Sequence, residues 1–227
     1  MGLMKSTSSA RSVLVAVALI FSSGFPSSLQ AANASWAKAA QAWSESVALE
    51  KNSDFVGALA KMVDFAQAGG DLYLTEIRCG WLSYSAKDYK AAARHYEAAA
   101  QSNTNALTPL LGTLNSYKAL NETTRAEKTA EAVLLRDPAN YTALQLLGNG
   151  ALDRRDYRRS AQCYEAILKN YPEDTAALSG EAWSMLYLAK KREASIAFQL
   201  LLTLSPSYPY AQQGYDAATK SLITSAR

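Results

Sequence analysis

The chain has 227 residues, of which 49% are hydrophobic and 19% charged, and this balance excludes wholesale disorder. Its formal net charge is only +3, so the composition gives no support to binding of nucleic acid or of a membrane through a global electrostatic field. Glycine and proline are sparse, with 11 and 6 residues, whereas alanine and leucine are abundant, and this favours helices.

Residues 1–34 have the pattern of a secretory signal peptide. Two basic residues precede an unbroken apolar run at 13–21, and small residues precede a predicted cleavage site after Ala34, with cleavage after Ala31 as the alternative. Nine helical residues span about 14 Å, against roughly 30 Å of hydrocarbon in a bilayer, so we favour cleavage over a retained membrane anchor. We therefore expect an exported protein, periplasmic if the source is Gram-negative and secreted otherwise.

Prolines then recur at a fixed interval of 34 residues, at Pro138, Pro172 and Pro206. A fixed period near this length, with a proline at the close of each repeat, is typical of a solenoid of helix-turn-helix repeats. Extending the period in both directions divides residues 35–208 into five repeats. Their bounds are 39–72, 73–106, 107–140, 141–174 and 175–208.

Small and bulky residues occupy fixed columns within these repeats. We call the two expected helices of each repeat A and B. Small residues recur in the middle of helix A, at Gly80, Gly148 and Ala182, and early in helix B, at Ala58, Ala92, Ala126, Ser160 and Ala194. A bulky residue follows four positions later, at Met62, Tyr96, Tyr164 and Phe198. Repeat 107–140 reverses the pattern with Leu114 and Ala130, an exchange that preserves volume.

This pattern resembles the tetratricopeptide repeat (TPR) family over essentially all of the chain after residue 34. The resemblance implies an all-α fold, a right-handed α-solenoid of antiparallel helix pairs, with a C-terminal capping helix within 209–227. Asp54, Asp88 and Asp156 are placed to cap helix B, because a carboxylate accepts hydrogen bonds from the exposed N–H groups there. Repeat 39–72 ends in two glycines instead of a proline, and we expect it to be a degenerate N-terminal cap.

The sequence contains no motif for catalysis, for phosphate binding or for a metal, so we expect a non-catalytic protein with no cofactor and no metal. The single histidine, His95, is expected to be a partly exposed helical residue. Cys79 and Cys163 are separated by two repeat steps, on the order of 20 Å, whereas a disulfide needs Cα atoms within roughly 7 Å. We therefore expect two buried free thiols.

The resemblance implies that helix A of each repeat lines a concave groove that binds an extended peptide or a partner protein. The side chains expected to face this groove are Ile77, Trp81, Tyr84, Asn115, Lys118, Gln145, Asn149, Trp183 and Tyr187. Asn115 and Asn149 share one column, and an amide can pair with any extended backbone because it both donates and accepts. The basic residues of the family's two-carboxylate clamp are replaced by Leu111, Ala176 and Gly180, so an acidic C-terminal peptide is not expected.

Basic residues also gather at the turns between helices A and B: Lys87, Lys90, Arg154, Arg155, Arg158, Arg159, Lys190, Lys191 and Arg192. We favour a solvated basic edge, partly neutralised by Asp153, Asp156 and Glu193, over a binding surface. The sequence thus predicts a non-catalytic scaffold or adaptor of the cell envelope that binds an unidentified protein or peptide in its groove. Two alternatives stay open: a self-assembling structural element, and an adaptor for an anionic polymer or lipid through the basic edge.

Overall fold

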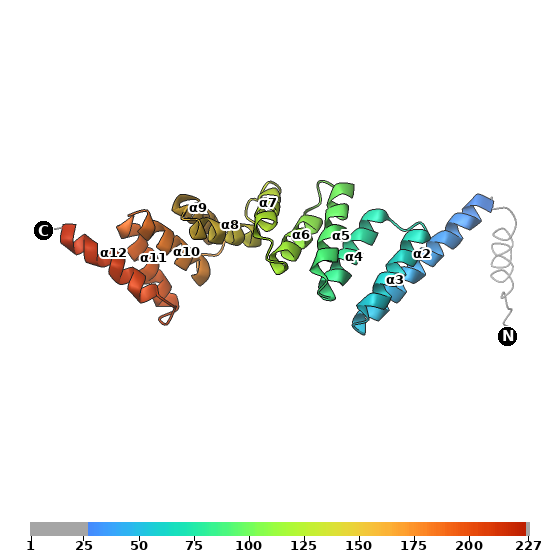
Figure 1. Ribbon diagram of the computed structural model, residues 1–227, viewed down its shortest axis with the longest axis horizontal. Helices are drawn as coiled ribbons and strands as arrows, with labels where there is room; N and C mark the ends of the chain where they lie inside the picture. Colours follow the sequence, from blue (N-terminus) through green and yellow to red (C-terminus); the bar gives the residue numbers. More distant parts are fainter. Residues whose placement is uncertain (1–26, 226–227) are drawn as a thin grey trace, which may run out of the picture. The chain divides into compact units, whose positions relative to one another are not determined.

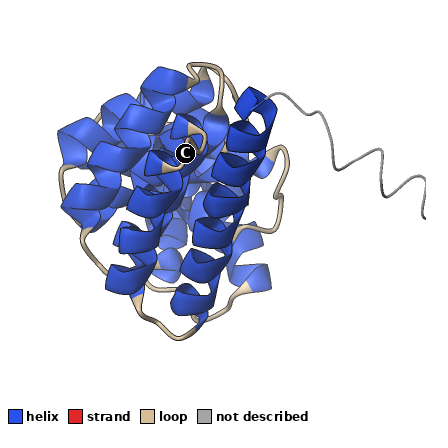
Figure 2. Cartoon of the chain, turned by 90° about the vertical axis from the view of Figure 1, so that its right-hand side faces the viewer, coloured by secondary structure: helices blue, strands red, loops and turns tan. Residues whose placement is uncertain are grey.

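The computed structural model describes residues 27–225, with side chains from 31 to 220, and all of these residues lie in helices or loops (Figure 2). Most of the expected signal segment, 1–26, lies outside the described residues. The described helices are α2 (Ser27–Lys51), α3 (Phe55–Gln67), α4 (Leu72–Ser85), α5 (Tyr89–Ser102), α6 (Leu107–Ala119), α7 (Thr123–Leu134), α8 (Tyr141–Asp153), α9 (Tyr157–Leu168), α10 (Thr175–Tyr187), α11 (Lys191–Leu204) and α12 (Ala211–Ser225) (Figure 1).

The chain divides into two compact units, Met1–Thr75 and Glu76–Arg227, which we describe separately. In the N-terminal unit, α2 and α3 pack together, with Met62 and Phe65 buried between them. The Trp43 ring lies 5.3 Å from the Phe65 ring, between ring centroids, whereas Trp36 is 70% exposed. Within this unit, Trp43 is therefore part of the helix-pair core.

The C-terminal unit contains most of α4 and all of α5–α12. The even-numbered helices α4, α6, α8 and α10 are A helices and α5, α7, α9 and α11 are B helices. Each B helix packs against the A helix or terminal helix that follows it, and α10 also contacts α8 and α12 (Figure 1). The predicted all-α solenoid of helix pairs, with a single terminal helix, is confirmed.

The turn between α2 and α3 and the four turns between A and B helices of the C-terminal unit share one backbone conformation. The second residue after the A helix has a positive φ, between 57° and 64°, and these residues are Ser53, Lys87, Asn121, Arg155 and Ala189. The next N–H bonds to a carbonyl five residues back, as Asp156 N does to Ala151 O at 2.8 Å. This is a Schellman motif, which satisfies carbonyls that the helix end leaves unpaired.

The B helices begin directly after this turn. The carboxylates of Asp54, Asp88 and Asp156 accept from the backbone N–H three residues on, at 2.9, 3.0 and 3.1 Å, so the predicted caps are confirmed. Lys190 occupies the same place without a side-chain cap. At the other end, α7 and α9 stop at Leu134 and Leu168, four residues before Pro138 and Pro172, so these prolines lie within the following loops.

A recurring feature in the core of the C-terminal unit is an aromatic ring held between small residues. Tyr164 of α9 lies against Gly148 and Gly180, and a β-carbon added at Gly180 would overlap its ring. Tyr96 and Phe198 lie against glycines in the same way in other helix pairs. In the pair α6–α7 the sizes are reversed, and Leu114 and Ala130 are both fully buried in one cluster. The exchange of volumes inferred from the sequence therefore occurs inside the core.

Helix α12 covers the last helix pair. Its small residues Ala211, Gly214 and Ala218 are buried, and Ala211 and Ala218 join the cluster around Phe198 and Leu201. Helix α12 is the last helix within 27–225, and no B helix follows it there.

Candidate partner-binding surfaces

Residues 27–225 contain no cluster of three or more His, Cys, Asp or Glu side chains that could hold a metal ion, and no helix there has the length and apolarity to cross a membrane. Cys79 and Cys163 are buried free thiols, as expected. Burial raises the pKa of the Cys79 thiol to about 11, so this thiol is protonated at neutral pH. His95 is partly exposed, and its Nδ1 lies 2.7 Å from a carboxylate oxygen of Glu76.

The residues predicted for the groove all lie on A helices, but they differ in exposure. Trp81 is 50% and Tyr187 54% exposed, and Asn115, Lys118 and Asn149 are also exposed. The remaining four, Ile77, Tyr84, Gln145 and Trp183, are partly buried.

An aromatic cleft lies beside the turn between α8 and α9. Tyr187 of α10 is stacked on Tyr157 of α9, with ring centroids 4.6 Å apart, and on Trp183, at 5.8 Å. Trp183 in turn meets Phe198 edge to face, which anchors the stack in the core. The cleft has a volume of about 610 Å³ and is lined by Leu152, Asp153, Arg155, Tyr157, Trp183 and Tyr187. It brings together two predicted groove residues and Arg155 of the predicted basic edge.

The predicted amide column does not have one role. The carbonyl oxygen of Asn149 accepts a 2.5 Å hydrogen bond from the hydroxyl of Tyr164, whose pKa burial raises to about 12. Asn115 is related to Ala130 as Asn149 is to Tyr164, and alanine supplies no hydroxyl. Gln145 donates to the Tyr141 hydroxyl at 3.1 Å. Asn149 and Gln145 therefore hydrogen-bond to tyrosine hydroxyls of the fold, whereas the position that corresponds to Tyr164 for Asn115 is Ala130.

Two of the nine basic-edge residues form ion pairs with α7. Arg154 donates to Glu127 at 2.7 Å, and Arg159 donates to Glu131 at 2.6 Å. The carboxylate of Asp156, which we expected to neutralise the edge, caps α9. The other members are exposed or partly buried. The edge is thus less basic than its arginine count indicates.

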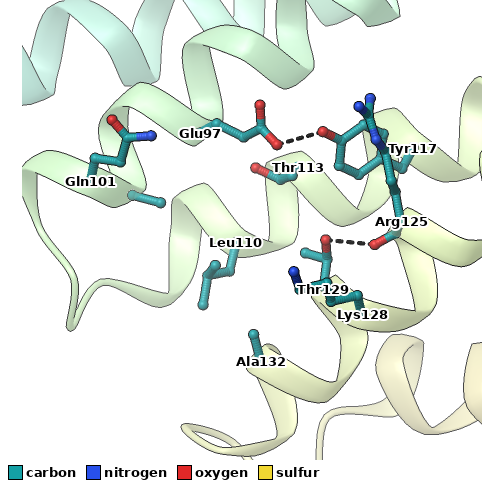
Figure 3. Close-up of a pocket in the computed structure, with 10 residues that line it drawn as sticks. Glu97, Gln101, Leu110, Thr113, Tyr117, Arg125, Lys128, Thr129 and Ala132 are labelled. Atoms are coloured by element: carbon teal, nitrogen blue, oxygen red, sulfur yellow. Dashed lines mark hydrogen bonds between the residues drawn. The ribbon is translucent and has the colours of Figure 1, made fainter.

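A second cleft, which the sequence analysis missed, lies between B helices α5 and α7 with α6 as its floor (Figure 3). Its volume is about 470 Å³. The Tyr117 hydroxyl donates to Glu97, and the Arg125 guanidinium lies 5.3 Å from the centre of the Tyr117 ring. Burial, and then Glu97, raise the pKa of Tyr117 to about 12. The lining residues are Glu97, Ala100, Gln101, Leu110, Thr113, Tyr117, Arg125, Lys128, Thr129 and Ala132.

Small residues on both walls leave room for this cleft. The column of Ala100 holds leucine in the other three B helices, at Leu134, Leu168 and Leu202. The column of Ala132 holds alanine in α5 and α9 as well, and leucine only in α11, at Leu200. A comparison of the outer columns of the B helices is the sequence signal that could have revealed it.

No protein-family model and no curated protein matches the chain. Several solved structures do. A tetratricopeptide repeat protein from Parabacteroides merdae is 19% identical and has a TM-score of 0.64, with 84% of this chain and 75% of that chain covered. For YrrB, described as a TPR protein with an unusual peptide-binding site, the identity is 12%, the TM-score 0.62 and the coverage 76% and 89%. MamA from Desulfovibrio magneticus RS-1, residues 41 to the end, is 16% identical and has a TM-score of 0.61, with 76% of this chain and 97% of that chain covered. At such identities the likeness shows the fold alone, and that fold is the TPR-like solenoid.

Proposed function

We propose that this protein is a non-catalytic scaffold that binds a peptide or an extended protein segment along its A helices. The observation that carries the proposal is the aromatic cleft, in which the Tyr157, Tyr187 and Trp183 rings line a hollow flanked by Asp153 and Arg155. Rigid rings provide contact area at a low cost in conformational entropy, which is why they dominate binding energies at interfaces.

The bound segment lies across α6, α8 and α10. An apolar or flat side chain of the segment enters the cleft, and the exposed amide of Asn115 pairs with the backbone further along. The like-folded YrrB structure, whose description names a peptide-binding site, supports the class of ligand. The non-catalytic assignment rests on the absence of catalytic motifs from the sequence. We further propose that the scaffold acts after export, because of the signal-like pattern in residues 1–34.

The test is selection of a displayed random-peptide library on the purified chain, followed by titration of the enriched peptides. We expect Tyr187→Ala to weaken their binding at least ~10-fold, a loss within the range of interface hot spots. Tyr171→Ala is the matched control, because Tyr171 is 52% exposed and also packs against one neighbouring tyrosine, at a loop outside the cleft. Equal binding by both folded variants would refute the cleft as the site. Failure of any peptide to bind the parent chain would refute peptide binding itself.

The basic edge is a weaker candidate for a binding surface. Because Arg154 and Arg159 are paired with glutamates, an anionic polymer would have to compete with these ion pairs. Binding of heparin or of anionic vesicles that persists in ~0.3 M salt, a condition on the order of twice physiological ionic strength, would restore this alternative.

A further inference from the structure

The outer side of α11 carries an apolar stripe, by which we mean Ile196, Leu200 and Leu204. Their spacing of four residues places them on one side of the helix. The three residues are 59%, 43% and 43% exposed. Neither the core nor the proposed peptide cleft uses them.

The stripe is peculiar to α11 among the B helices of the C-terminal unit. The same three columns hold Arg94, Ala98 and Ser102 in α5; Lys128, Ala132 and Arg136 in α7; and Gln162, Ala166 and Asn170 in α9. Moreover, no charged residue occurs between 194 and 206. The repeat pattern requires no apolar side chains in these columns, and leaving apolar surface in water is unfavourable.

The cleft between α5 and α7 is the complementary feature. It has alanine at 100, in a column where the other three B helices of the C-terminal unit carry leucine, and alanine at 132, where only α11 carries leucine; its floor includes Leu110. The stripe extends over about 12 Å of helix, at about 1.5 Å per residue, and the lining of the cleft along α7, from Arg125 to Ala132, extends over about 10 Å. The two features thus match in length, and the apolar part of the cleft lining, formed by Ala100, Leu110 and Ala132, is where the stripe would lie.

We propose that the stripe on α11 of one copy docks in the cleft between α5 and α7 of a second copy of this chain. Leu200 then lies beside Ala132 of the other copy, where it occupies the space that a leucine at 132 would fill. Charge is also complementary: Glu193 is exposed near the start of α11, one turn before the stripe, and Lys128 lies on the cleft rim. Their pairing places α11 parallel to α7 of the second copy.

This contact joins two different surfaces, so it relates the copies head to tail. Each added copy presents a free stripe at one end of the assembly and a free cleft at the other, and a contact of this kind generates open chains, or rings of several copies where the rotation closes. Self-association should therefore continue beyond the dimer as concentration rises.

Two variants isolate the two halves of the contact. Leu200→Asp removes the stripe but keeps the cleft, and Ala132→Leu fills the cleft but keeps the stripe. We expect each variant alone to self-associate at least ~10-fold more weakly than the parent chain in sedimentation velocity, as for the loss of an interface hot spot. An equimolar mixture should form a dimer and nothing larger, because only one complementary pair of surfaces is left.

Leu135→Asp is the control, because Leu135 is 84% exposed at the end of α7 and lies outside both surfaces. Its association should equal that of the parent chain, and circular dichroism should show native helix content for all three variants. The proposal is overturned if the mixture stays monomeric, if the parent chain is a monomer at all concentrations, or if Ala132→Leu alone still associates. The last result would indicate an α11–α11 contact.

The charge pair supplies an independent check of orientation. Lys128→Glu and Glu193→Lys should each weaken self-association severalfold, whereas the double variant should recover it. A double variant as weak as the two single variants would overturn the parallel placement of α11.

Discussion

Single side chains in this protein are fixed by what stands opposite them in the next helix. The Tyr164 ring occupies the space between Gly148 and Gly180, and its hydroxyl holds the Asn149 amide. Tyr164 therefore both fills the core and holds the Asn149 side chain in place on the surface of α8.

Gly180→Ala should lower the free energy of unfolding by about 1–3 kcal/mol, because the added methyl overlaps the Tyr164 ring in a packed interior. The loss is expected even though alanine is the better helix former. Chemical denaturation with a circular dichroism readout measures it.

The matched control is Ser179→Thr, which also adds one methyl group to α10. Ser179 precedes Gly180 and is partly exposed, so the change there should alter the free energy of unfolding by less than about 0.5 kcal/mol. An equal loss in both variants would contradict the role of the ring contact.

The buried tyrosines predict sensitivity to alkali. Burial raises the pKa values of Tyr96 and Tyr164 to about 12, from an ordinary value of 10.0. Between these two pH values the unfolded chain loses phenolic protons that the folded chain keeps, so this contribution to stability is full below about pH 10 and falls as pH rises toward 12. Denaturant titrations at several pH values measure the slope. Tyr164→Phe should make the slope shallower, and an unchanged slope would contradict the assignment.

At the scale of the element, the turns between A and B helices combine a favourable hydrogen-bond pattern with an unfavourable φ. Ala189 has φ 59°, where a β-carbon crowds the following carbonyl oxygen. Ala189→Gly should therefore raise the free energy of unfolding by about 0.5–1 kcal/mol, after allowance for the greater freedom of glycine in the unfolded chain. Thermal unfolding measures the gain. As a control, Ala194→Gly, in the interior of α11, should destabilise the fold.

The next residue offers a second stabilising change. Lys190 stands where Asp54, Asp88 and Asp156 cap their helices, and it makes no side-chain cap. Lys190→Asp should add about 0.5–2 kcal/mol of stability through a hydrogen bond to a backbone N–H of the first turn and through its charge at the helix N-terminus. Denaturant titration measures the gain. Lys190→Ala controls for the loss of the lysine, and an equal gain from both variants would argue against the cap.

The elements were largely predictable because their causes are local and repeated. The 34-residue period placed the helix pairs, and the aspartates placed the starts of B helices. The turn conformation was not predictable, because the chain uses Lys87, Arg155 and Ala189 where glycine would have signalled a positive φ. The prolines indicated the loops but not the ends of α7 and α9, which stop four residues earlier.

At the scale of the whole molecule, contacts run mainly between neighbouring helices, so stability in the C-terminal unit is expected to be local as well as global. Deleting α12 would uncover Phe198 and Leu201. Native-state hydrogen exchange should then show faster exchange in α10 and α11, with protection in α5–α8 largely kept. Uniform loss of protection through α5–α11 would indicate one cooperative block instead.

The candidate surfaces were predicted less well than the fold. Trp183 and Tyr187, which were predicted from their columns, line the aromatic cleft, and their role in binding stays a prediction. The hydrogen bond between Asn149 and Tyr164 could not be predicted in this way, because it depends on a contact between two helices. The cleft between α5 and α7 was not predicted, because small side chains leave it open and the repeat pattern was defined by the positions of large residues. A space of this kind can be located only once the positions of the neighbouring helices are known.

The reversed sizes of Leu114 and Ala130 bear on how this array can be rearranged. The junction after α5 joins the Tyr96 ring to Gly112, and the junction after α9 joins the Tyr164 ring to Gly180, whereas the junction after α7 places Ala130 in the column of the rings and Leu146 in the column of the glycines. The helix pairs therefore cannot be exchanged for one another without changing the packing of the core. In a tandem duplicate of α10–α11, the Phe198 ring would lie against the glycine at position 180 of the second copy. In a duplicate of α8–α9, the Tyr164 ring would overlap Leu146 of the second copy. The side chains in the core therefore determine the order in which the repeats can follow one another.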